Sequence, residues 1–173
     1  MFMSRLRVAY LPGASLNELS IAELFVVSSL RLWLLPHCDS GTHYPDWRQG
    51  FLRARIETKG ARSFDELCRI LASSTLKPFL VHRLHCPVLA EHESWILQLL
   101  GLAQRAQLSE ARASLTLRCA PTGARLALKP AQTVARSLNA RRLCLAFAAG
   151  HPNDAPCAAH LPTVPVPGST SVH

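Results

Sequence analysis

Two clusters of histidine and cysteine are the residues of this chain best suited to chemistry, because imidazole and thiolate are the ligands that zinc prefers. The first cluster is His37, Cys38 and His43, and the second is His82, His85 and Cys86, with His92 nearby. Both lie beside prolines, in segments without a regular hydrophobic period. If a metal binds, we expect zinc held by His82, His85, Cys86 and one residue of the first cluster.

The spacing of these clusters does not match a standard zinc finger, and the sequence has no C-x-x-C pair. A competing interpretation is therefore that Cys38 and Cys86 pack as small apolar groups. The histidines would then cap chain ends or lie in solvent. On that interpretation we expect no cofactor.

Catalytic motifs are not evident. Cys86 follows His85, but adjacent side chains point in different directions, so this proximity does not indicate a nucleophile and its base. His92-Glu93 lacks the second histidine of H-E-x-x-H, and neither a G-x-S-x-G elbow nor a glycine-rich phosphate loop occurs. The sequence therefore favours a protein that is not an enzyme.

Charge indicates a different kind of partner. The 173 residues include 19 basic and 11 acidic ones, a net charge of +8, and only three of the basic residues are lysines. The densest basic run, which Glu57 interrupts, is Arg48, Arg53, Arg55, Lys59 and Arg62. Such a run is typical of a surface that attracts nucleic acid or acidic lipid. The alternative is a compositional bias toward arginine with no function.

The same region resembles a helix-turn-helix in outline, with a helix at 46–57, a break at Gly60 and a second helix at 64–77. On this boundary, Asp65 and Glu66 would open the second helix, where DNA phosphates would repel them. We therefore favour two packed helices with a basic, solvated face.

Hydrophobic periodicity predicts a compact all-α bundle of about six helices. The expected segments are 15–35, 46–56, 63–77, 88–106, 110–119 and a last helix from Pro130 onward. Ser15 to Glu18 and Ser63 to Glu66 have the capping-box pattern, and Pro36 should end the first helix. The helix at 88–106 is apolar nearly all round and should be central. Residues 79–86 should be extended or irregular.

Composition divides the chain into a helical domain at 1–147 and a disordered, Pro/Ala-rich tail at 148–173. No standard signal peptide is evident. The apolar stretch at 19–35 contains Glu23 and Arg31, which argues against a membrane span. The six cysteines are widely spaced, so we expect free thiols in a reducing cytoplasm.

The helix at 19–35 is apolar on most sides, so it either forms the core or docks onto a second chain. The predicted interface residues are Leu24, Phe25, Val27, Leu30 and Trp33. The leading prediction is a small soluble accessory or regulatory protein that acts through protein contacts, with an unknown partner or a second copy. The alternatives are a basic nucleic-acid-binding regulator and a zinc-binding protein.

Overall fold

The computed structural model describes residues 10–38 and 44–145. In these ranges the chain forms a short 3-10 helix and six α-helices. It also forms two isolated β-bridges, and these ranges contain no strand. The elements are η1 (Leu16–Glu18), α1 (Ile21–Cys38), α2 (Arg48–Arg53), α3 (Thr58–Ser74), α4 (Glu91–Gln104), α5 (Leu108–Arg118) and α6 (Pro121–Asn139). The predicted all-α bundle is confirmed. The predicted tail at 148–173 and the domain boundary at 147 lie outside the described residues.

The first helix does not run from 15 to 35 as the sequence predicts. Ser15 caps η1, and α1 begins after Ser20. There the Glu23 carboxylate accepts the Ser20 N–H at 2.6 Å, while the Glu23 N–H lies 3.4 Å from the Ser20 hydroxyl. This reciprocal pair is a capping box that the sequence analysis missed. Pro36 does not end α1: it lies inside the helix, lacks one helical hydrogen bond there, and is followed by two more helical residues.

The boundary between α2 and α3 also differs from the prediction. The second helix is only six residues long, and α3 begins at Thr58. Gly60 lies inside α3 rather than breaking it, and the predicted capping box at Ser63 to Glu66 is part of the helix. The reason is tertiary: a Cβ at Gly60 would lie 2.7 Å from Oγ of Ser137, so the missing side chain lets α6 approach.

The pair α3 and α6 is packed closely at both ends. Gly60, near the start of α3, faces Ser137 near the end of α6, and Gly123 near the start of α6 faces Ser74, the last residue of α3. The two helices are therefore antiparallel. The prediction that α6 begins at Pro130 is wrong: Pro121 occupies its first turn, and Pro130 is a buried residue within it.

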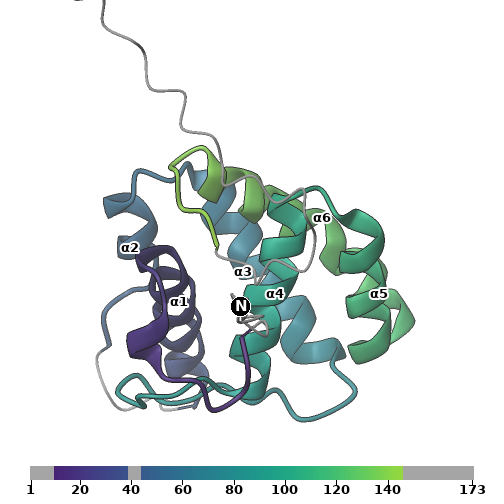
Figure 1. Cartoon of the computed structure of the whole chain (residues 1–173), viewed down its shortest axis with the longest axis horizontal. Helices are drawn as coiled ribbons and strands as arrows, with labels where there is room; N and C mark the ends of the chain where they lie inside the picture. Colours follow the sequence, from purple (N-terminus) through teal and green to yellow (C-terminus); the bar gives the residue numbers. More distant parts are fainter. Residues whose placement is uncertain (1–9, 39–43, 146–173) are drawn as a thin grey trace, which may run out of the picture.

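The helix α4 forms the centre of the bundle, as the sequence predicts. Ten of its fourteen residues are buried, and it packs against α1, α5 and α6. Figure 1 shows α2, the start of α3 and the residues after α6 along the upper edge. The end of α1 and the segment before α4, residues 79–90, lie along the opposite edge. The molecule therefore has two distinct ends.

The helix α1 has the length and mean hydropathy of a membrane-spanning helix. In this structure, however, it packs into the bundle with eight of its residues buried, Glu23 and Arg31 among them. The core helix of a soluble protein has the same composition, so the fold is compatible with a soluble protein.

Candidate functional site

We call the edge with the end of α1 and residues 79–90 the lower end of the bundle (Figure 1). It contains a buried ion pair between α1 and α4. Nε of Arg31 lies 2.7 Å from Oε1 of Glu93, and Nη2 lies 2.9 Å from Oε2. The side chains are 1% and 0% exposed. This bidentate geometry is the strongest form of an arginine–carboxylate contact.

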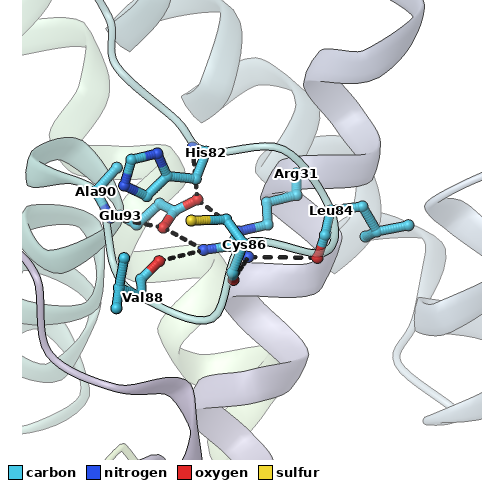
Figure 2. A network of polar contacts seen from close by, with 7 residues as sticks. All are labelled: Arg31, His82, Leu84, Cys86, Val88, Ala90 and Glu93. Carbon is cyan, nitrogen blue, oxygen red and sulfur yellow. Dashed lines mark hydrogen bonds and ion pairs between the residues drawn. The ribbon is translucent and has the colours of Figure 1, made fainter.

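Both partners of this pair also bind the backbone of residues 82–90, which wraps around them (Figure 2). Arg31 donates to the carbonyl oxygens of Cys86 at 2.6 Å, Val88 at 2.8 Å and Leu84 at 3.4 Å. A guanidinium has five N–H donors, so all are used.

The Glu93 carboxylate is equally saturated. Besides the two bonds from Arg31, it accepts the N–H of His82 at 3.0 Å and that of Ala90 at 2.8 Å. A carboxylate offers about four lone-pair positions, and these four bonds fill them. A buried ion pair offsets its desolvation only when such additional bonds are made. The network therefore fixes the path of the irregular segment 79–90 against α1 and α4.

Sequence reasoning missed this pair. It treated Arg31 as a charge that argues against a membrane span, and Glu93 as part of an incomplete metal motif. The available signal was that each residue is one of few charges within a strongly apolar helical stretch, and such charges are rarely buried unless paired. Their separation of 62 residues gave no local hint that they meet.

The two predicted His/Cys clusters converge in part. Cys38 at the end of α1 and both His82 and His85 line one cavity of about 670 Å³. His37 instead stacks on Trp33, with ring centroids 4.7 Å apart. His43 lies outside the described residues.

The remaining residues of the second cluster have structural partners. Cys86 is half-buried and gives its carbonyl to Arg31. Nδ1 of buried His92 accepts the N–H of Leu80 at 3.0 Å. Burial lowers the pKa of His92, which keeps the imidazole neutral and able to accept this bond. Over residues 10–38 and 44–145, no three His, Cys, Asp or Glu side chains are placed to hold one metal ion.

The predicted basic run lies on the surface. The side chains of Arg48, Arg53, Arg55, Lys59 and Arg62 are all exposed. Arg48 is engaged by Asp46 at 3.4 Å and stacks over the ring of Trp47. The other four cations end α2, follow it or lie in the first turns of α3.

Packing of α3 against α6 brings more cations to this end. Because Gly60 faces Ser137, the start of α3 lies beside the end of α6. The last turn of α6 and the turn after it carry Arg136, Arg141 and Arg142, all exposed. We call the basic end the group Arg53, Arg55, Lys59, Arg62, Arg136, Arg141 and Arg142. It has seven cations, and the same segments contain one acid, Glu57.

The boundary of α3 also removes the argument against phosphate binding. Asp65 and Glu66 do not open the helix, because α3 begins seven residues before Asp65, and its first turn has no acidic residue. Asp65 faces the bundle, where it accepts the Trp33 indole N–H at 2.7 Å and the Arg69 Nε–H at 2.9 Å. Burial alone would raise the pKa of Asp65, but these two bonds and the Arg69 charge lower it.

The predicted partner interface on α1 is largely part of the core. Val27, Leu30 and Trp33 are at most 3% exposed. Leu24 and Phe25 are half-buried, and Phe25 packs on the ring of Phe51 at 5.1 Å between centroids. In this conformation a partner reaches only the edge of the predicted surface.

Comparisons with protein-family models, with curated proteins and with solved structures found no match to this chain. The interpretation of its sites therefore depends on geometry and charge alone.

Proposed function

We propose that this protein is a non-enzymatic nucleic-acid-binding protein that contacts the phosphate backbone through its basic end. The main observation behind this proposal is that three segments with exposed cations, around α2, the start of α3 and the end of α6, lie along one edge of the bundle (Figure 1). Arginine and lysine on one face are the electrostatic footprint of nucleic-acid binding.

Two further features support the proposal. The sequence has no acidic residue between Glu110 and Asp154, so α6 adds positive charge without a compensating negative one. The N-terminal end of α3, which points to the basic end, carries the positive end of the helix dipole. Cys38, Cys68, Cys86 and Cys119 are free thiols, which fits a reducing compartment such as the cytoplasm.

Among the functions expected from the sequence, the proposal favours nucleic-acid binding over contact with a protein partner. Contact with a protein partner through α1 loses support, because Val27, Leu30 and Trp33 already pack within the chain. Nucleic-acid binding gains support, because its predicted residues are exposed and three further arginines join them.

The test is the salt dependence of binding to a short labelled DNA duplex, measured by fluorescence anisotropy. We expect log K to fall linearly with log salt between about 50 and 200 mM, with a slope of about −0.9 per phosphate contacted. The triple variant Arg55→Gln/Lys59→Gln/Arg62→Gln should weaken binding and reduce the slope by up to about 2.7, which is three such contacts.

The matched control removes the same charge elsewhere. Arg83, Arg112 and Arg125 are exposed and lie outside the basic end. The variant Arg83→Gln/Arg112→Gln/Arg125→Gln should keep the slope of the wild type. Equal losses in the two triple variants, or no salt-sensitive binding by the wild type, would overturn the proposal.

A further inference from the structure

The lower end of the bundle has a cavity that the basic end does not share. It lies between the second half of α1, residues 44–45 and the segment 81–85, with a volume of about 670 Å³. Small-molecule sites typically have about 300–1,000 Å³ and mostly apolar walls with a few polar groups. This cavity has the size and the position, at the junction of two elements, of such a site.

Its described lining combines apolar side chains on two sides with several polar ones. Leu34 and Leu35 of α1 form one apolar wall, and Val81 and Leu84 form the facing one. Most polar side chains of the described lining come from the segment 82–85, where His82, Arg83 and His85 are exposed, and Cys38 and Tyr44 add a thiol and a phenol. An occupant would therefore meet aliphatic side chains along its body and hydrogen-bond donors at one end.

Among the described side chains that line the cavity, the charge that no ion pair balances is positive. Arg31 contributes to its lining, but Glu93 balances its charge and all five of its N–H groups are used. Arg83 forms no ion pair within residues 10–38 and 44–145. The described lining contains no aspartate or glutamate. Within the described lining, a cation that no acid balances lies beside aliphatic side chains, and this combination favours an anionic group.

The wall that carries these groups is fixed before any ligand arrives. The backbone of His82 donates to Glu93, and the carbonyls of Leu84 and Cys86 accept from Arg31 (Figure 2). A site with a fixed backbone binds without the cost of ordering a loop. The buried ion pair therefore links α1 to α4 and also holds one wall of the cavity in place.

We infer that this cavity binds a small amphipathic anion, whose aliphatic body lies between the leucine walls and whose carboxylate or phosphate meets Arg83. His82 and His85 add imidazole N–H donors at the same end. The site and its ligand are independent of the nucleic-acid-binding surface.

The test compares four decyl probes by titration calorimetry on the full chain, at concentrations below their micelle formation. The probes are decanoate, decyl phosphate, decanol and decyltrimethylammonium. We expect the two anions to bind at least about tenfold more tightly than the neutral alcohol, as a charge-assisted hydrogen bond provides, and the cation not to bind. The preferred anion distinguishes a carboxylate from a phosphate ligand.

Two variants locate the binding. Arg83→Gln should weaken both anions about tenfold or more without changing the affinity for decanol. The matched control Arg112→Gln, which removes the same charge on α5, should bind as the wild type does. Leu35→Trp, which fills the apolar wall, should weaken decanoate and decanol alike.

The proposal is overturned if no probe binds, if decanol binds as tightly as decanoate, or if Arg83→Gln and Arg112→Gln behave alike. The basic-end triple variant should still bind decanoate. A failure of the cavity proposal is therefore distinguishable from a failure of the proposed nucleic-acid binding.

Discussion

Two helix pairs of this protein are held together by opposite means. The pair α3 and α6 is joined by close approach, with a glycine of each helix against a serine of the other at both ends. The pair α1 and α4 is joined by the saturated polar network of Arg31 and Glu93, which also anchors residues 82–90. The first arrangement depends on shape, and the second depends on every donor and acceptor being paired.

The difference has a consequence for what each end can do. Close packing of α3 on α6 brings two separate basic stretches to one surface, and its closest contacts join glycines to serines. The network at the other end fixes an irregular segment that presents polar side chains beside an apolar cavity. We therefore expect variants in the two regions to differ in size of effect and in pH dependence.

The largest effect is expected from breaking the buried ion pair. Glu93→Gln leaves the Arg31 charge without a counter-charge in the core, so unfolding free energy should fall by about 3–5 kcal/mol. Urea denaturation followed by circular dichroism measures it. The control is Glu91→Gln, whose side chain is 38% exposed and pairs with Arg118 at 3.2 Å, and which should cost at most about 1 kcal/mol. Similar losses in the two variants would contradict the role of the network.

A double replacement sharpens this result. Arg31→Met/Glu93→Leu removes both charges, and in many proteins such a swap restores stability. Here it should not, because three carbonyls and two N–H groups of residues 82–90 lose their partners. Recovery to wild-type stability would show that the pair does not anchor this segment.

A smaller effect is expected at the close-packed pair. In Gly123→Ala the new Cβ would lie 2.2 Å from Cβ of Ser74, so α3 and α6 must separate. Overpacking of this kind costs about 1–3 kcal/mol, although alanine is intrinsically better in a helix by about 1 kcal/mol. The control is Gly50→Ala, whose Cβ would meet Phe25 at an ordinary 3.5 Å and should be neutral or stabilising. Thermal unfolding of both variants decides it, and a stabilised Gly123→Ala would contradict the close approach.

The smallest expected effect is the pH dependence of the unfolding free energy that arises from His92. Its pKa is lowered by burial, so the unfolded chain takes up a proton near the ordinary value of 6.5 that the folded chain does not. Stability is therefore full above that pH and declines as pH falls below it, by no more than about 1.4 kcal/mol per pH unit. His92→Asn, which keeps an acceptor for the Leu80 N–H, should flatten the dependence between pH 7 and 5 in urea titrations. An unchanged slope would assign the dependence to another group.

The sequence predicted the fold class well and several helix boundaries poorly. Hydrophobic pattern identified all six helices, because α3 and α6 each bury one apolar stripe and α1 and α4 are apolar on most sides. The sequence indicates a break at Gly60 and a last helix that begins only at Pro130, whereas Gly60 and Gly123 both lie in helices at points of close approach. Such contacts depend on the partner helix, so no local pattern reveals them. Pro36 and Pro130 both lie inside helices, Pro36 two residues before the end of α1 and Pro130 buried within α6.

The candidate sites were predictable to different degrees. The exposed run from Arg48 to Arg62 was visible in the sequence, but its extension by Arg136, Arg141 and Arg142 requires the antiparallel pairing of α3 and α6. The Arg31–Glu93 pair and the cavity beside it could not be predicted, since residues 62 apart meet only through the fold.

The central claim is that the basic end binds nucleic acid and the end with the cavity does not. It is tested most directly by mapping backbone amide shifts of the ¹⁵N-labelled protein during titration with the DNA duplex. The account predicts that the largest shifts fall on residues 53–62 and 136–142, while residues 79–90 move little. Shifts centred on residues 79–90, or spread evenly over the chain, would contradict it.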